Sequence, residues 1–471
     1  MATLIVQHPL YDTLPVGQEV IFTVSNTSVV SSFTNVKFIA EVHISDGDPP
    51  NTATVNDIVG TFKTTPNNAG VGMFDFRPII ESFVNAQNKA YDWSAFKTTY
   101  SNIVPFGIHL IDKYARNTEV IKYLAVKFKV EFLDDDSTSP TFGEVITTGI
   151  VDSDLYKVFN GYLKYTDEIS LSGNNFGFNT KPFQLGGGAS GQRFLTNAPT
   201  TQYANIEDYG TLPFLTTPKG QNVAYTTLKQ FQIFMYDVDG VPIGSVISIK
   251  NVDSDGGFNV WNAHINRQMM FLGCFPANLR NWSSVFNAAI PTLDHYFVQA
   301  YNSTGQAISD RITININCPT LKGYEPIRLT WLNQWGGWDY YTFKMKSSKT
   351  ISTKGSTYQQ LAGRWNEKSY RLDSFKGGKK SFRVNATEKI TMNTDFVSET
   401  ESEWFEELIN SPEVYILEGF KTDTFNSALN QYVIPVRLTT SNYTKKTVAN
   451  DKLMQYTFEV EKSKTLRTQA V

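Results

Sequence analysis

Alternation of apolar and polar residues with a period of two is the feature that most constrains how this chain can fold. The run that begins at residue 16 places Val20, Phe22 and Val24 on one face of an extended segment. Residues 119–133 repeat the alternation over a length that suits one long strand. A period of two is typical of half-buried β-strands. The sequence therefore predicts a mainly β fold.

The spacing of these strands predicts three regions. A length of 471 residues also suggests about three domains, at roughly 150 residues each. Residues 295–317 form a predicted hairpin like the last two strands of an immunoglobulin or fibronectin type III sandwich, and residues 106–132 suggest the same device. We therefore expect tandem antiparallel sandwiches over 1–137 and 138–320, followed by a β-rich C-terminal domain over 321–471.

A long polar insertion interrupts the second region. Residues 171–192 are rich in Gly, Ser and Asn and contain few apolar side chains that could hold them in place. Two interpretations remain open from sequence: an ordered loop that packs on a neighbouring subunit, or a flexible insertion.

One segment of the third region predicts a short helix, over residues 398–409. Ser398 and Glu401 have the spacing of a capping box, and Pro412 stops the helix because it cannot continue the hydrogen-bond ladder. The apolar face of this helix carries Trp404, Phe405, Leu408 and Ile409. Strands are expected after it, over residues 413–418, 432–440 and 453–463.

The composition argues against several classes of protein. Charged residues make up 18% of the chain and aromatic residues 14%, which suits surfaces that neighbours cover. The net charge is -3 and no basic stripe is evident, so we expect no nucleic-acid recognition; residues 377–383 are interpreted as a solvated loop or edge. No apolar run approaches the ~18 residues of a membrane span, and no signal peptide is recognisable, so synthesis in a cytosol is expected.

We find no constellation that predicts catalysis or a cofactor. The best metal candidate is a weak calcium site at Asn251, Asp253 and Asp255. Position twelve of that pattern is Asn262 rather than the bidentate Glu that calcium loops use, so a simple turn explains the segment equally well. The glycine-rich run 186–193 lacks the Lys of a phosphate-binding loop.

Two cysteines, Cys274 and Cys318, stand alone, without metal-ligand spacing. We expect two buried thiols in a reducing compartment. Whether they pair in a disulfide cannot be decided from sequence.

An aromatic-rich segment, "WLNQWGGWDYYTF" at residues 331–343, is the most unusual feature of the third region. Gly336 and Gly337 supply a turn between two short strands. The aromatic residues are Trp331, Trp335, Trp338, Tyr340 and Tyr341. They predict a hairpin that lies in a core or at a subunit interface, because they alternate with polar residues and continue into strands. Contact with a glycan is the alternative.

The order of motifs over residues 321–469 resembles that of tail proteins from tailed bacteriophages that infect Bacteroidetes, including the crAss-like group. The motifs are W-x-N-x-x-G-G-x-D-x-x-x-F, then T-E-x-E-W-x-E-E-L-x-x-S-P-x-V-Y, then I-P-V-x-L-T followed by N-D-K-L-x-x-Y-T-x-E-x-E. The resemblance is weaker over 1–135 and absent over 138–320.

The resemblance implies a structural component of a virion tail: a ring, hub, distal-tail or baseplate subunit. Such a protein would be made in the cytoplasm of the bacterial host and would act by self-assembly without catalysis. Its partners would be copies of itself in a symmetric ring and other tail or neck proteins. The alternative is a receptor- or carbohydrate-binding adhesin on the phage particle.

Overall fold

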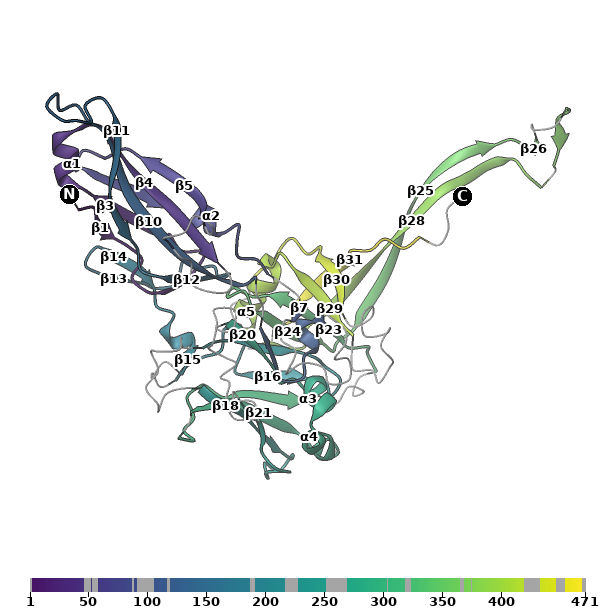
Figure 1. Ribbon diagram of the computed structural model, residues 1–471. Coiled ribbons are helices and arrows are strands. Elements are labelled where there is room, and N and C mark those ends of the chain that lie inside the picture. Colours follow the sequence, from purple (N-terminus) through teal and green to yellow (C-terminus); the bar gives the residue numbers. More distant parts are fainter. Residues whose placement is uncertain are drawn as a thin grey trace. The chain divides into compact units, whose positions relative to one another are not determined.

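The protein is mainly β, as the alternation predicts, with several antiparallel sheets and one short helix near the C-terminus (Figure 1). This computed structural model describes residues 2–45, 52, 58–86, 89–90, 106–116, 119–186, 191–216, 228–250, 269–302, 304–317, 323–364, 368–373, 375–418, 433–445 and 454–467. Two compact units make up the chain: unit 1 is Met1–Ile316 with Leu332–Asp339, and unit 2 is Asn317–Trp331 with Tyr340–Val471.

Unit 1 begins with a β-sandwich. Its smaller sheet has the order β1-β3-β6, from Leu4–Gln7, Ile21–Ser25 and Val71–Asp75. Its larger sheet has the order β2-β12-β10-β4-β5, with β11 also paired to β10. These strands are Thr13–Pro15, Tyr156–Phe159, Ile121–Leu133, Thr34–Ser45, Ile58–Thr64 and, for β11, Val145–Asp152.

Aromatic side chains fill the space between these two sheets. The ring of Phe22, on β3, lies 5.6 Å from the ring of Phe128, on β10. Phe74, on β6, lies 5.8 Å from Phe128. All three side chains are buried, so the inward positions of the alternating pattern form one continuous core. Two short helices, α1 (Thr27–Ser32) and α2 (Arg77–Ile80), lie at strand ends.

A second pair of sheets completes unit 1. One has the order β15-β17-β20-β9, from Gln184–Leu185, Thr211–Thr216, Met269–Gly273 and Tyr114–Arg116. The other has the order β16-β22-β21-β18-β19, from Thr201–Ala204, Ile312–Ile316, His295–Asn302, Leu228–Tyr236 and Ile247–Lys250. Phe214 on β17 and Phe231 on β18 meet edge to face with ring centroids 4.9 Å apart. The predicted hairpin at residues 295–317 is present as β21–β22, and β18 pairs antiparallel with β19 in the same sheet.

The sequence does not predict several smaller elements of unit 1. Helices α3 (Pro276–Trp282) and α4 (Ser284–Ala289) were not predicted, and both are too short for a clear apolar period. Short pairs β7–β8 (Lys89–Ala90 with Phe106–Gly107) and β13–β14 (Ile169–Ser172 with Asn175–Phe178) are also present.

Unit 2 contains a seven-stranded sheet of order β24-β23-β29-β30-β31-β28-β25. The strands are Trp338–Phe343, Ile327–Leu332, Val414–Leu417, Val433–Leu438, Thr457–Lys462, Gly378–Asn393 and Ser347–Gln360. Helix α5, Glu399–Asn410, has the predicted capping box between Ser398 and Glu401. Its Phe405 ring lies 5.4 Å from that of Phe458 on β31, so the helix covers the sheet through its predicted apolar face.

The predicted closing hairpin at residues 106–132 is wrong. Strand β9 pairs with β20 of the second sandwich, whereas β10 pairs with β4, β11 and β12 of the first. The sheet that contains β10 also extends past the expected boundary at residue 137, because β11 and β12 belong to it. Sequence periodicity identifies strands, but pairing between distant strands depends on packing that the local pattern does not encode.

The described residues of the polar insertion, 171–186 and 191–192, contact other parts of their own chain. Strand β14 forms a hairpin with β13 and contacts the N-terminal segment of its own chain. The Asn175 side chain accepts a hydrogen bond from the backbone N–H of His8 at 3.1 Å, and Leu10 N–H donates to the Phe176 carbonyl at 2.9 Å. Backbone hydrogen bonds therefore hold this segment in place, although it has few apolar side chains that could do so.

None of the helices in the described part of the chain is both long enough and apolar enough to cross a membrane.

Candidate functional site

The most unusual element of unit 2 is a long two-stranded arm. Strand β25 (14 residues) pairs antiparallel with β28 (16 residues) along its whole length, from Ser347 opposite Met392 to Gln360 opposite Gly378. At ~3.4 Å per residue, β25 spans roughly 45 Å. A small hairpin of β26 (Gly363–Arg364) and β27 (Arg371–Leu372) forms the tip. Figure 1 shows β25 and β28 running as a ribbon away from the other strands of their sheet. We call residues 347–393 the arm.

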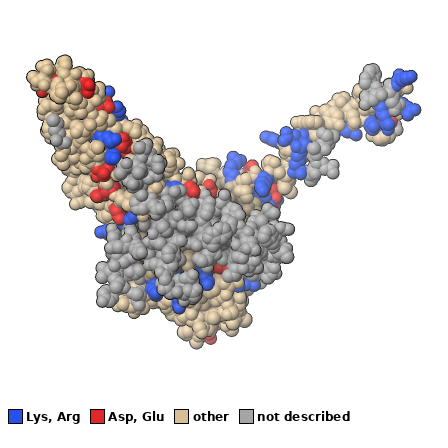
Figure 2. Space-filling model, in the orientation of Figure 1, with Lys and Arg blue, Asp and Glu red and all other residues tan. Residues whose placement is uncertain are grey.

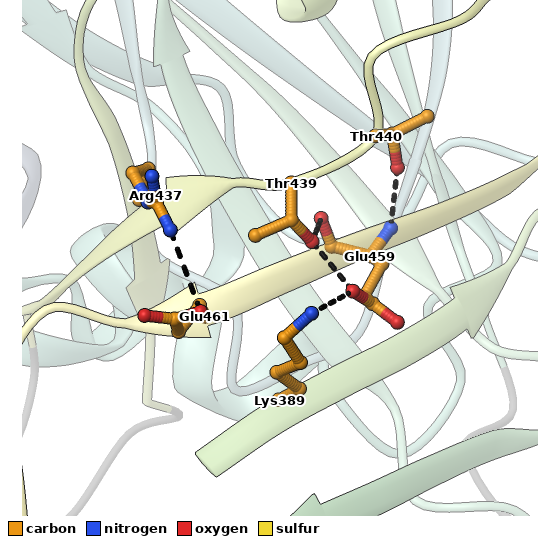
Figure 3. A network of polar contacts seen from close by, with 6 residues as sticks. All are labelled: Lys389, Arg437, Thr439, Thr440, Glu459 and Glu461. Carbon is orange, nitrogen blue, oxygen red and sulfur yellow. Dashed lines mark hydrogen bonds and ion pairs between the residues drawn. The ribbon is translucent and has the colours of Figure 1, made fainter. Parts of the chain in front are cut away.

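Cross-strand polar contacts fix the base of the arm (Figure 3). The Lys389 ammonium, on β28, lies 2.9 Å from the Glu459 carboxylate on β31, and the Thr439 hydroxyl lies 2.7 Å from the same carboxylate. These two contacts hold the pKa of Glu459 below its ordinary value. Arg437 pairs with Glu461 at 3.5 Å on the neighbouring strands. Backbone pairing sets the register of the base, and these exposed ion pairs add a small contribution to it.

Beyond its base, the arm has no sheet on either side within the part of the chain that the structure describes. The pairing of β28 with β31 covers only Lys389–Asn393, and the last bridge outward joins Ala386 to Leu466. From there to the tip, β25 and β28 pair only with each other. Isolated two-stranded hairpins are marginally stable at best in water, so an element of this kind is typical of a segment that a partner covers.

The arm exposes apolar side chains that a free surface would not need. They are Ile351, Leu361, Tyr370, Leu372, Phe375, Phe382 and Val384. Phe375 is 77% exposed and Leu372 71%. Such a concentration of exposed apolar side chains on one narrow element is typical of an interaction surface.

The arm is also strongly basic. It carries ten Lys and Arg against three Asp and Glu, a formal charge of +7, whereas the rest of the chain carries 32 against 42, a formal charge of -10. Figure 2 shows the Lys and Arg side chains spread along it. Lys354, Lys379 and Lys380 are exposed and form no ion pair with any described residue. The predicted solvated edge at 377–383 is thus the outer part of β28.

The predicted aromatic hairpin is shared between the two units. Its turn belongs to unit 1, where Asn333 organises it: the side-chain oxygen accepts hydrogen bonds from the backbone N–H groups of Trp335 (3.0 Å) and Gly337 (2.9 Å). Trp335 stacks 5.3 Å from Phe178, and Trp338 meets His109 edge to face at 5.0 Å.

The other aromatic residues of this hairpin belong to unit 2. Trp331 is fully buried and lies 4.8 Å from Trp404 of helix α5. Tyr341 meets Phe405 edge to face at 4.9 Å and is half-buried, while Tyr340 is buried. The aromatic side chains of "WGGW" therefore fill interior positions and do not form an exposed sugar-binding platform.

The other candidate positions from the sequence are the predicted calcium ligands and the two cysteines. Asn251, Asp253 and Asp255 lie outside the described residues, as does Cys318. Among the described residues, no group of three or more His, Cys, Asp and Glu side chains could hold a metal ion. Cys274 is a buried free thiol, and burial raises its pKa.

Sequence reasoning missed the arm. A signal was present: "SSKTISTKGSTYQQ" has the Thr and Ser content of a strand but no apolar face. A strand without an apolar face cannot lie on a core, so it must stand in solvent or against a partner.

No protein-family model matches this chain, and no curated protein is significantly similar to it.

Proposed function

We propose that this protein is a structural subunit of a bacteriophage tail that acts by self-assembly and not by catalysis. It would occur as multiple copies in a ring, hub, distal-tail or baseplate layer of the virion, together with other tail or neck proteins. The arm carries this proposal, because it is a long basic hairpin whose apolar side chains lie in solvent in the single chain.

Two further features support an assembly role. The base of the arm is anchored in the seven-stranded sheet through paired strands and ion pairs. The motifs that resemble phage tail proteins contribute to the core of unit 2, where Trp331 and Trp404 pack together. Both features concern structure and assembly rather than chemistry.

The adhesin alternative has less support. It rested on an exposed aromatic cluster, and Trp331, Trp335 and Trp338 are each no more than 2% exposed. A sugar would have to stack on aromatic faces that other side chains already cover.

The test is a chain with a shortened arm. Lys354 and Asn385 lie opposite each other, so residues 355–384 can be replaced by an Asn-Gly turn without changing the register of the base. We expect the wild-type chain to form cyclic assemblies, visible by negative-stain electron microscopy, and the shortened chain to remain monomeric.

The control is the fold of the shortened chain, followed by circular dichroism and the thermal midpoint, which should match those of the wild type. A shortened chain that still forms the same rings would overturn the assignment of assembly to the arm. A wild-type chain that never associates, but binds host-surface glycans, would favour the adhesin.

A further inference from the structure

A second surface of the chain complements the arm in both charge and hydrophobicity. Residues 134–156 contain six Asp and Glu and no Lys or Arg. This segment includes the turn before β11 and all of β11. Its exposed large apolar side chains are Phe142 (58%), Val145 (64%) and Ile150 (63%). We call residues 135–154 the acidic edge.

Hydrogen bonds to Asp134 hold the turn that precedes β11. The Asp134 carboxylate accepts a hydrogen bond from the Thr141 hydroxyl at 2.7 Å, and its backbone carbonyl accepts one from Gly143 at 2.8 Å, which holds the turn closed. Hydrogen bonds from the side chains of Ser139 and Thr141 keep the pKa of the Asp134 carboxyl below its ordinary value. The Asp134 side chain is therefore buried and hydrogen-bonded within the turn, whereas Asp135, Glu144 and Asp154 are exposed.

Strand β11 contains a bulge and has one face toward the core and one face outward. The register with β10 shifts between Phe128 and Val130, and Gly149 occupies the left-handed region with φ +67. Ile146 and Val151 pack against the core, so Val145 and Ile150 face outward.

Strand β11 is also an edge strand. Within the described residues it pairs with β10 and with no other strand. The nearest lysines on β10 are already engaged, Lys127 with the Thr52 carbonyl at 2.6 Å and Lys129 with Glu41. Strand β25 of the arm is likewise the end strand of its sheet. Unpaired edges of this kind are templates for pairing with another chain.

We propose that the arm of one copy docks on the acidic edge of a second copy of this chain. The proposal rests on the self-assembly proposed above and names its contact. Lys354, Lys379 and Lys380 would face Asp135, Glu144 and Asp154, and the apolar side chains of both elements would be covered together. Because the two surfaces differ, each copy offers one of each, and the contact repeats head to tail into a ring.

A nucleic acid is the competing occupant for a basic ribbon, but the observations favour protein. A phosphate backbone would use the cations and leave the exposed Phe375, Phe382 and Leu372 uncovered. The chain as a whole is acidic, at -3, which opposes binding to DNA.

The experiment reverses charge on each surface of the full chain. The arm variant is Lys354→Glu/Lys379→Glu/Lys380→Glu, and the edge variant is Asp135→Lys/Glu144→Lys/Asp154→Lys. Asp134 and Asp136 are left intact because they form hydrogen bonds within the turn. Lys37→Glu/Lys181→Glu/Lys229→Glu is the matched control, with the same change of charge at exposed lysines of unit 1. Self-association is measured by sedimentation equilibrium.

We expect each single variant to raise the self-association Kd at least about tenfold, because like charges then face each other. The control should leave the Kd unchanged within a few-fold. A chain that carries both sets of reversals, or an equal mixture of the two single variants, should recover the wild-type Kd, since an acidic arm again meets a basic edge.

Four outcomes would contradict the proposal. Failure of the double variant to recover association overturns the arm–edge contact, as does wild-type association that neither variant weakens; self-assembly by another surface survives both results. Loss of binding to a DNA duplex in the arm variant, with unchanged self-association, identifies a nucleic-acid surface instead. A wild-type chain that stays monomeric at its highest soluble concentration overturns the proposed function as well.

Discussion

At the residue scale, Trp404 links helix α5 to the sheet of unit 2. Its side chain is 4% exposed, lies 4.8 Å from Trp331 and stacks on Phe405. Trp404→Ala should lower the free energy of unfolding of unit 2 by about 3–5 kcal/mol, because a buried indole leaves a cavity that the helix cannot close.

The measurement is urea unfolding followed by far-ultraviolet circular dichroism. Glu403→Ala is the matched control, since the neighbouring Glu403 is exposed and should change stability by less than ~0.5 kcal/mol. A loss below ~1 kcal/mol for Trp404→Ala would mean that the indole contributes little to packing.

Gly336 is the residue whose backbone the aromatic hairpin most depends on. It has φ +73, and a Cβ at this position would lie 2.3 Å from the Asn160 carbonyl oxygen. Gly240 has nearly the same φ, +74, with no atom within 4 Å of its Cβ position. Gly240→Ala should therefore cost only the left-handed penalty of about 1 kcal/mol. Gly336→Ala should cost about 1–3 kcal/mol more, because Asn160 must move.

Both substitutions lie in unit 1, so the same unfolding transition reports on each. Equal losses for the two variants would show that the turn does not approach Asn160 as closely as described.

Glu459 gives the base of the arm a pH dependence. The pKa of its carboxyl is lowered by Lys389 and Thr439, so its folded-state pKa lies below the unfolded value. The stability that it contributes is present above the unfolded pKa and is lost as pH falls through the folded pKa. Its carboxylate is more than a third exposed, so the effect is small, at most ~1 kcal/mol.

Glu459→Gln should be slightly less stable than the wild type near neutral pH, and the difference should vanish under acidic conditions. Chemical unfolding at a series of pH values measures it. A difference that does not change with pH would assign the effect to packing rather than to the ion pair.

At the scale of elements, the arm should be the least protected part of unit 2. In the part of the chain that the structure describes, its outer strands pair only with each other, and a two-stranded ribbon opens easily. Trypsin should cut the free chain first at Lys354, Lys379 or Lys380, with the fragments identified by mass spectrometry. Lys122 and Lys157, which are buried in the first sandwich, serve as the internal reference and should be cut much later.

Assembly should protect these arm sites if a second copy covers them. Cleavage of the free chain within the sandwich before the arm would contradict the marginal stability of the hairpin.

At the scale of the whole molecule, the chain passes between the two units at residues 316/317, 331/332 and 339/340. A chain that ends at residue 316 therefore lacks residues 332–339, which belong to unit 1. A fragment of residues 1–316 loses Asn333, Trp335 and Trp338, whose partners Phe178 and His109 remain.

We expect this fragment to melt at a lower temperature than unit 1 of the full chain and to bind a hydrophobic dye, because the surface that residues 332–339 cover becomes exposed. Differential scanning calorimetry and dye fluorescence test this. An unchanged melting temperature would mean that residues 332–339 contribute little to the stability of unit 1.

Local signals in the sequence determined many of the elements of this fold. The alternation around Phe22 predicts a strand, and the Ser398–Glu401 spacing predicts the start of helix α5, because both depend on interactions between near neighbours. The burial of Trp331 and Trp404 follows from the same patterns, since large aromatic side chains spaced for one face seek a core.

Only the tertiary structure decided how those elements are combined. The pairing of β9 with β20, the insertion of residues 332–339 into unit 1 and the exposure of the arm all depend on contacts between residues far apart in the chain. A strand pattern states which face is apolar but not which strand lies beside it. For the arm, the sequence supplied the basic and apolar residues. Only the structure shows that, among the described residues, no further strand pairs with its outer part, which leaves these side chains exposed.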